Sequence, residues 1–147
     1  MDKQKIILCQ GLPASGKSTW AIQHCIDNPE FIRVNKDTIR GFFGDLKWNS
    51  KFEKDVIDIQ RLIANTALRQ GKSVIVDDTN FNPKIKAYWK ELANCYDIEF
   101  HIEAFDTPVE VCIERDLKRE KSVGMHVILN MYNIYLNKEK PLDGDKK

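Results

Sequence analysis

The sequence lacks an apolar run of membrane-spanning length, and its first residues lack the hydrophobic stretch of a secretion signal. An excess of one charge is also missing, because 23 lysines and arginines face 22 aspartates and glutamates, for a net charge of +1. A chain this close to neutral has no overall field that attracts polyanions, so any contact with nucleic acid must depend on a local basic patch. These absences predict a cytoplasmic protein and argue against one that wraps a duplex.

Cysteine and histidine are few and scattered. The cysteines are Cys9, Cys25, Cys95 and Cys112, and none of them forms a C-x-x-C pair. All four fall in apolar segments, so we expect buried, reduced thiols rather than disulfides or metal ligands. The three histidines are equally scattered.

Internal repeats, low-complexity segments and linkers are absent too. The 147 residues, 42% hydrophobic and 31% charged, have the composition of one globular domain. We therefore expect a single domain over residues 1–147, in which 140–147 form a polar tail.

One motif stands out from this ordinary background. Residues 11–18 read Gly-Leu-Pro-Ala-Ser-Gly-Lys-Ser, which fits the Walker A pattern G-x-x-x-x-G-K-[ST]. The apolar run before them predicts a buried strand over 5–9, and residues 19–26 predict a helix that begins near Lys17. A strand, a glycine-containing turn and a helix in this order form a phosphate-binding loop. The chain should therefore bind ATP or another nucleoside triphosphate.

Main-chain N–H groups and the start of the helix supply most phosphate contacts in such a loop. Lys17 should reach the β- and γ-phosphates as a point charge, and the Ser18 hydroxyl should ligate Mg²⁺. The two glycines let the backbone approach the phosphates without a side-chain clash. We expect the nucleotide to contact Gly11, Pro13, Ala14, Ser15, Gly16, Lys17, Ser18 and Thr19.

Strands and helices alternate along the rest of the chain. Apolar periodicity and breakers predict strands at 31–34, 73–77 and within 97–105, and helices at 37–40, 50–70, 83–94, from 109 onward and at 125–138. Because parallel neighbours need helical crossovers, the pattern predicts an α/β fold with a parallel sheet of about four to five strands and helices on both faces. The ligand site of such a sheet lies at the carboxyl ends of its strands.

Local patterns predict further details of two helices. The sequence from Ser50 to Glu53 is a capping box for the longest helix. Thr107 should cap the helix that begins at 109. The inward face of that helix should consist of Val109, Cys112, Ile113 and Leu117.

Asp37 and Arg40 follow the second strand, one helical turn apart on one face. At the lip of the site, a carboxylate can accept the proton of an attacking hydroxyl, and Arg40 can bind a phosphate or carboxylate of the same acceptor. The same spacing fits a helix cap at Asp37 that Arg40 neutralises. Spacing alone leaves both interpretations open.

Asp77 and Asp78 end the strand at 73–77, where an acidic residue of a phosphate-binding protein organises Mg²⁺ or its bound water. We expect Asp78 to contact the metal together with Ser18, although either acid fits the pattern. An exposed strand end is the alternative interpretation. The absence of a D-x-x-G sequence argues against a GTPase switch.

Arg115 and Arg119 are four residues apart and off the inward face of their helix, so they should project together from an exposed face. Arginines on a mobile lid neutralise charge on a transferring phosphoryl group and exclude water. A solvated, salt-bridged helix face is the alternative.

The motifs G-x-P-x-S-G-K-S-T-W, N-K-D-x-x-R, D-T-N-x-N-P and E-R-x-x-x-R occur in an order that resembles the kinase domain of phage-type polynucleotide 5′-kinases. The likeness spans nearly the whole chain. It implies a P-loop kinase fold with a lid, and ATP-dependent phosphorylation of 5′-hydroxyl ends of DNA or RNA during nucleic-acid repair. It also implies a phosphatase or ligase as a fused or separate partner.

The same likeness implies roles for individual residues. Lys17 and Arg119 would bind the transferring phosphoryl group, with Arg115 in support. Asp37 would be the general base, and Arg40 would bind the acceptor's phosphate. Transfer would be direct and in line, without a covalent phosphoenzyme.

The chain also departs from that family. Lys36 stands where the family often has arginine, and no D-x-D-G-T phosphatase sequence follows. Either the protein is a kinase alone, or residues 140–147 lead into a second domain.

Two other functions fit the residues. A small-molecule kinase for a sugar, nucleoside or antibiotic would use the same fold, and a nucleotide-binding module would hydrolyse ATP slowly without transfer. Phe42, Phe43 or Trp48 could stack on a terminal base, although the same residues fit a core. The sequence leaves open whether the chain forms a homo-oligomer.

Overall fold

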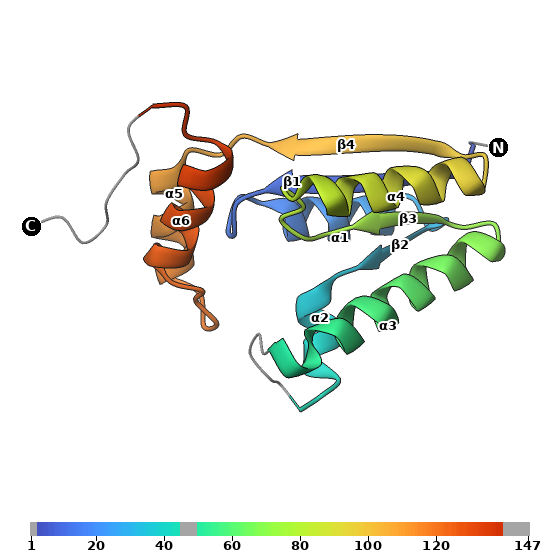
Figure 1. Cartoon of the computed structure of the whole chain (residues 1–147), viewed down its shortest axis with the longest axis horizontal. Helices are drawn as coiled ribbons and strands as arrows, with labels where there is room; N and C mark the ends of the chain where they lie inside the picture. Colours follow the sequence, from blue (N-terminus) through green and yellow to red (C-terminus); the bar gives the residue numbers. More distant parts are fainter. Residues whose placement is uncertain (1–2, 45–49, 140–147) are drawn as a thin grey trace, which may run out of the picture.

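The computed structural model describes residues 3–44 and 50–139. Within these residues, four parallel strands form one sheet in the order β2-β3-β1-β4 (Figure 1). The strands are β1 (Lys5–Gly11), β2 (Phe31–Val34), β3 (Ser73–Val76) and β4 (Glu99–Phe105). The helices are α1 (Lys17–Asp27), α2 (Lys36–Gly41), α3 (Ser50–Arg69), α4 (Pro83–Cys95), α5 (Val109–Leu117) and α6 (Met125–Tyr135). The expected α/β fold with a parallel sheet is confirmed.

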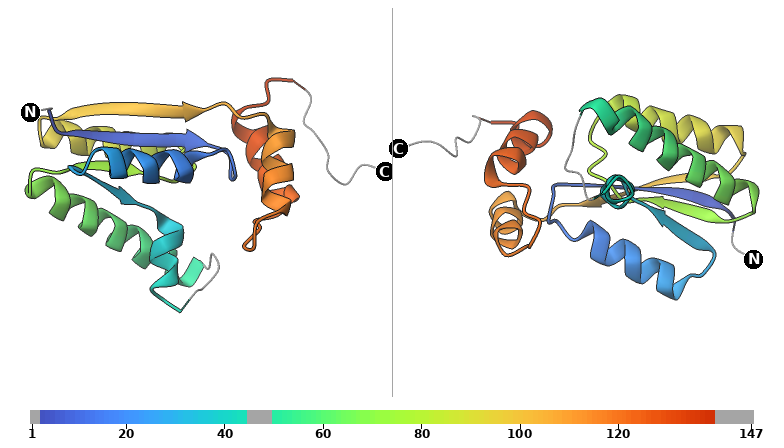
Figure 2. Two further views of the ribbon diagram at one scale, coloured as in Figure 1. Left: turned by 180° about the vertical axis from the view of Figure 1, so that it is seen from behind. Right: turned by 90° about the horizontal axis from the view of Figure 1, so that it is seen from below.

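Successive side chains of β1 enter cores on opposite faces of the sheet. Ile6 and Leu8 lie in the core on the side of α3 and α4, which includes Trp89 of α4. Ile7 and Ala21 belong to the other core, against α1. Figure 2 shows α3 and α4 on one face of the sheet and α1 on the other. Because both faces are covered, β1 is apolar at successive positions instead of alternating with polar residues.

The α5–α6 pair packs beyond the carboxyl ends of the strands (Figure 1). Phe81, which follows β3, and Leu12, which follows β1, pack in one buried cluster with Val109 of α5 and Ile128 of α6. Phe81 also stacks on Tyr135, with ring centroids 5.2 Å apart. This cluster holds the α5–α6 pair over the end of the sheet where ligands of α/β folds bind.

The end of α5 differs from the sequence prediction. Val109 and Cys112 are buried as expected, but Leu117 is 70% exposed and Asp116 is 1% exposed. The helix stops at Leu117, and the chain after it folds back onto the Asp116 carboxylate. Counting apolar residues could not detect this burial, because the buried side chain is charged.

Thr107 does not cap α5, contrary to the prediction. Pro108 takes the N-cap position without a side-chain hydrogen bond. The Thr107 hydroxyl instead donates a hydrogen bond of 2.8 Å to the carbonyl oxygen of Ser15, which ties the start of α5 to the loop after β1. The predicted capping box falls on Ser50, whose side chain lies outside the described residues.

All four cysteines are free, but they are not uniformly buried as predicted. Cys9 and Cys112 are buried, Cys25 is partly buried and Cys95 is exposed. Burial, followed by the charge of Asp77, raises the pKa of Cys9 to about 12, so this thiol stays protonated at neutral pH. Cys95 reaches the surface because it is the last residue of α4. In the described part of the chain, no helix has both the length and the apolarity needed to cross a membrane.

Candidate active site

Residues 12–16 form a tight loop between Gly11 at the end of β1 and Lys17 at the start of α1. Ala14 and Gly16 have positive φ angles of 63° and 104°, a backbone arrangement that gathers main-chain N–H groups around an anion. Gly11 has no room for a side chain, because a Cβ there would lie 2.7 Å from Ser15 Oγ and 3.0 Å from Phe105 Cβ. No side chain caps the start of α1, so its first N–H groups are available to a ligand. The loop has the geometry of a phosphate-binding site.

Lys17 is buried at the base of this loop, with 7% of the residue exposed. Its ammonium donates hydrogen bonds to the carbonyl oxygens of Gly11, at 3.0 Å, and Leu12, at 2.7 Å. Burial lowers the pKa of Lys17, and the negative charge of Asp77 opposes that shift. The amine is therefore held inside the loop by weak neutral acceptors that an anionic ligand can replace.

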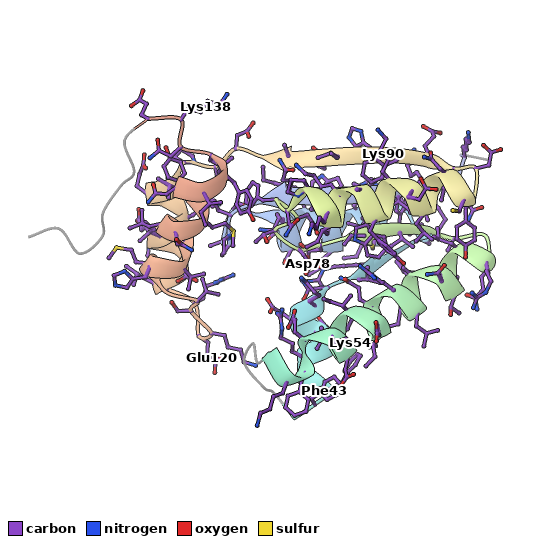
Figure 3. The ribbon with its side chains drawn as sticks, in the orientation of Figure 1. Phe43, Lys54, Asp78, Lys90, Glu120 and Lys138 are labelled. Carbon is purple, nitrogen blue, oxygen red and sulfur yellow. The ribbon has the colours of Figure 1, made fainter. Side chains whose placement is uncertain are left out.

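A cleft of about 1200 Å³ opens in front of the loop. The cleft brings together every predicted site residue except Gly11: Pro13, Ala14, Ser15, Gly16, Lys17, Ser18, Thr19, Asp37, Arg40, Asp78, Arg115 and Arg119. Figure 3 shows Asp78 at the end of the sheet, between the corner where α2 meets α3 and the α5–α6 pair. Residues that are more than a hundred positions apart in the chain thus face one cleft.

Asn35, not Asp37, caps α2. The Asn35 Oδ1 atom accepts a hydrogen bond of 3.0 Å from the Thr38 N–H. The sequence left open whether Asp37 is only a cap that Arg40 neutralises. The cap is Asn35 instead, whereas the ion pair between Arg40 and Asp37 is present. Asp37 projects at the rim of the cleft with 82% of its side chain exposed.

Arg40 lies between two carboxylates on this wall of the cleft. Its Nη1 donates to Asp37 Oδ1 at 2.5 Å, and its Nε and Nη2 donate to the two oxygens of Glu53, at 3.2 and 2.6 Å. Burial alone would lower the pKa of Arg40, but the hydrogen bonds and charge of Glu53 outweigh it and raise the pKa. Asp37 Oδ2 accepts no hydrogen bond from any residue that the structure describes. Oδ1 of Asp37 is therefore fixed by Arg40, while Oδ2 stays available to a ligand in the cleft.

The two aspartates after β3 have different surroundings. Asp78 accepts hydrogen bonds on both oxygens, from the Lys36 N–H at 3.0 Å and from Gln60 Nε2 at 2.7 Å, and burial raises its pKa. Asp77 accepts a bond from Arg33 on Oδ2, at 2.6 Å. Its Oδ1 is buried without a hydrogen-bond partner, alone in this respect among the side chains described. Asp77 thus has an unused acceptor that fits a cation or water.

Arg115 and Arg119 line the opposite wall of the cleft, but they do not share an exposed helix face as predicted. Because α5 ends at Leu117, Arg119 extends from the loop after the helix. Arg115 Nη1 lies 3.5 Å from the carbonyl oxygen of Ala14, and Arg119 Nη2 donates to Asp116 Oδ1 at 2.8 Å. The tertiary fold, rather than helical spacing, places both guanidinium groups at the cleft.

Asp116 organises the loop that carries Arg119. Besides the Arg119 bond, its carboxylate accepts hydrogen bonds from Ser122 Oγ at 2.6 Å, Val123 N at 3.0 Å and Gly124 N at 2.9 Å. Burial alone would raise the pKa of Asp116, but these hydrogen bonds lower it to about 2. A buried carboxylate, rather than an apolar contact, therefore fixes the shape of this loop.

Asp116→Asn should lower the free energy of unfolding at neutral pH by about 2 kcal/mol, because the carboxamide replaces one acceptor oxygen by a donor. Since the native pKa lies below its ordinary value of 3.8, the carboxylate stabilises fully above that value and loses its contribution as the pH falls toward 2. The stability gap between wild type and variant should therefore close with acid. Urea unfolding across this pH range measures it, with Asp55→Asn on the exposed side of α3 as control. A gap that does not change with pH would contradict the assignment.

The aromatic residues considered for base stacking do not line the cleft in the described part of the chain. Phe42 is 66% exposed, Phe43 contacts another aromatic ring on α3, and Trp48 lies outside the described residues. Trp20 and Phe105 line the cleft, with ring centroids 5.8 Å apart. Stacking by Phe42 or Phe43 stays a prediction.

Sequence reasoning missed three residues that shape the site. Arg33 is a charged residue within a four-residue strand of otherwise apolar composition, which was a usable signal. Glu53 was interpreted as part of a helix cap, and its pairing with Arg40 depends on how α2 and α3 meet. Asp116 gave no signal, since an aspartate in a charged run is usually solvated.

Comparisons with known proteins identify a family and relatives of this chain. Residues 6–135 match the family model AAA_33, described as an AAA domain. L-seryl-tRNA(Sec) kinase from Methanococcus maripaludis is 29% identical over 134 residues, which are 86% of this chain and 51% of that protein. A bifunctional polynucleotide phosphatase/kinase from Schizosaccharomyces pombe is 32% identical over 97 residues, 66% of this chain and 20% of that protein.

A solved structure agrees with these sequence matches. A chain in the structure of the Pnkp1/Rnl/Hen1 RNA repair complex aligns with a TM-score of 0.71 and 26% identity, covering 87% of this chain and 42% of that one. The chain therefore spans about half the length, or less, of the relatives it matches.

Proposed function

The chain belongs to the AAA-domain family whose model matches residues 6–135, with the fold of P-loop kinases, and from this we propose that it transfers the γ-phosphate of ATP to 5′-hydroxyl ends of DNA or RNA. One observation supports this most: the phosphate-binding loop with Lys17 and the exposed carboxylate of Asp37 line the same cleft. Likeness to a polynucleotide phosphatase/kinase supports the acceptor. Membership of the phage-type group is part of the proposal.

The donor nucleotide would lie along residues 11–18. Main-chain N–H groups and the uncapped start of α1 would bind its phosphates, and Lys17 would exchange its carbonyl partners for phosphate oxygens. Arg115 and Arg119 would bind from the opposite wall. A nucleoside triphosphate held this way presents its terminal phosphoryl group toward the Asp37 side of the cleft.

Mg²⁺ fits the residues present. The Ser18 hydroxyl and the buried, unpartnered Oδ1 of Asp77 would hold it or its bound water, and Asp78 stays a second candidate whose oxygens are already hydrogen-bonded. When bound, the ion would neutralise charge on the β- and γ-phosphates. Asp77 is the better candidate because burial of an unpartnered carboxylate oxygen is costly without such a ligand.

The proposed reaction is a direct displacement. The acceptor oxygen attacks the γ-phosphorus, the bond to the β-phosphate oxygen breaks, and ADP leaves. Asp37 Oδ2 accepts the hydroxyl proton, while Oδ1 stays bound to Arg40, which Glu53 holds in place. Lys17 and Arg119 stabilise the charge that spreads over the transferred group.

A second acceptor class is favoured by one observation. Three donor atoms of Arg40 are already hydrogen-bonded to Asp37 and Glu53. Arg40 therefore favours an anionic acceptor less strongly than an unpaired arginine would. A kinase for a neutral hydroxyl compound, or for an aminoacyl group as the name of the Methanococcus relative suggests, is the alternative. In either case Asp37 would play the same part.

Partners are part of the same proposal. The named relatives include a bifunctional phosphatase/kinase and a member of an RNA repair complex. We therefore propose that the chain works with a phosphatase or a ligase, fused or separate. Such partners would prepare or consume a 5′-phosphorylated end.

The proposal is tested with γ-labelled ATP, Mg²⁺ and matched oligonucleotides. Labelling should occur on DNA or RNA that carries a 5′-hydroxyl and should be absent from the same oligonucleotide carrying a 5′-phosphate. Equal labelling of both ends, or none on either, would contradict the polynucleotide function. Labelled nucleoside, sugar or seryl-tRNA in parallel reactions would instead establish the second acceptor class.

A further inference from the structure

Arg33, to which the sequence analysis assigned no role, lies inside the proposed metal site. It is the third residue of β2, and 23% of its side chain is exposed. Its Nε donates to Asp77 Oδ2 at 2.6 Å, and its Nη2 lies 3.4 Å from Ser18 Oγ. One guanidinium group therefore links the hydroxyl and the carboxylate that would hold Mg²⁺.

The surroundings of Asp77 explain why a cation is needed there. Asp77 is 1% exposed, and Arg33 supplies its one salt bridge among the described residues, leaving Oδ1 without a partner. Burying a carboxylate without a cation is costly, so Arg33 stabilises the metal-free protein. The same positive charge disfavours a divalent cation at the neighbouring Oδ1 of Asp77 and at Ser18 Oγ.

The local charges are balanced before any ligand binds. Lys17 and Arg33 face Asp77 and Asp78, since both aspartates act on the Lys17 amine and Asp77 binds Arg33 directly. Lys36 also acts on Asp78, but its charge is offset by Glu53, 4.0 Å away. Adding Mg²⁺ makes this group strongly positive, whereas without Arg33 the group would carry an excess negative charge that attracts the ion. Arg33 therefore weakens metal binding, because the ion must either displace the guanidinium group or bind against its charge.

We propose that Arg33 is a built-in counter-ion that competes with the divalent metal for Asp77 and Ser18 and thereby sets how strongly Mg²⁺ enhances nucleotide binding. The inference rests on the proposed nucleotide site, but not on the identity of the acceptor. Arg33 acts through Asp77 and Ser18, so it is a positioning residue that tunes the metal requirement.

The test measures ADP affinity by calorimetry, once in EDTA and once in excess MgCl₂, and compares the ratio of the two dissociation constants between variants. In Arg33→Gln, which keeps a donor but removes the charge, ADP should bind more weakly in EDTA and relatively more tightly with Mg²⁺. The ratio should exceed that of wild type about fivefold or more. Arg69→Gln, at the end of α3 and remote from the cleft, should leave the ratio unchanged.

If Arg33 only supported the fold, Arg33→Gln would shift both dissociation constants by the same factor. An unchanged ratio in Arg33→Gln would therefore overturn the proposal. Arg33→Lys, whose single ammonium cannot bridge both oxygens, should give a ratio between wild type and Arg33→Gln. If Arg33→Gln fails to fold, Arg33→Lys decides alone, and a wild-type ratio there would overturn the proposal. If wild type itself binds no ADP in either buffer, the proposed nucleotide site fails instead.

Discussion

Lys17→Met should reduce phosphoryl transfer about a thousandfold while leaving the protein at least as stable as the wild type. Activity falls because no other described side chain occupies the base of the loop with a positive charge that can reach the terminal phosphates. Methionine has similar length and fills the buried space without charge. The variant thus separates the electrostatic role of Lys17 from its packing.

The stability half of this prediction follows from the sign of the pKa shift. Burial lowers the native pKa of Lys17 below its ordinary value of 10.5, so at neutral pH the charged amine costs free energy of folding. Removing the amine removes that cost, and the loss of hydrogen bonds to the carbonyls of Gly11 and Leu12 offsets part of the gain. The wild type should gain stability relative to the variant as the pH rises toward the ordinary pKa of lysine.

Turnover and thermal unfolding of Lys17→Met measure both effects in one preparation. Lys54→Met on α3, where the lysine side chain is 87% exposed, is the matched control and should resemble wild type in both measurements. Turnover of Lys17→Met close to that of wild type would show that the terminal phosphates do not lie at this loop. A large loss of stability would show that the amine supports the fold rather than the ligand.

Asp37→Asn should reduce kcat by about a hundredfold to ten-thousandfold, because asparagine cannot accept the hydroxyl proton. Its amide oxygen can still accept the Arg40 hydrogen bond, so the wall of the cleft should keep its shape. The side chain is 82% exposed, so the free energy of unfolding should change little. KM for the acceptor should therefore stay near the wild-type value while kcat falls.

Steady-state kinetics with the labelled acceptor assay separate these outcomes. Asp106→Asn, an exposed aspartate on the connection between β4 and α5, is the control and should keep wild-type kcat. If Asp37→Asn turns over like wild type, another group removes the proton. If instead KM rises and kcat holds, Asp37 binds the acceptor without acting as base.

Local sequence was enough to predict most of the framework. The strand before residue 11 and the helix after Gly16 follow from apolar runs and from a glycine whose φ of 104° side-chain-bearing residues rarely adopt. The parallel sheet follows from alternation of strands and helices, because only helical crossovers connect parallel neighbours. The expectation that Asp37 and Lys17 face one cleft also holds, since the carboxyl ends of parallel strands lie at the same end of the sheet even though β3 separates β1 from β2.

Contacts between distant segments were beyond the sequence. Asn80 donates from its side chain to the Cys9 carbonyl, 71 residues away, and Arg33 pairs with Asp77 across 44 residues. Glu53 reaches Arg40 only because α2 and α3 form a corner. No spacing rule describes such pairs, since their separation along the chain is unrelated to their separation in space.

The sequence by itself determined where the backbone binds phosphate and which strand ends carry acids, because backbone conformation and amphipathic burial depend on residues within a turn or two of one another. The tertiary structure decided which acids are paired, which oxygen stays without a partner, and that Asp116 lies inside while Leu117 lies outside. The physical reason is desolvation. Whether a buried charge destabilises or stabilises the protein depends on the hydrogen-bond donors and opposite charges that distant segments place beside it.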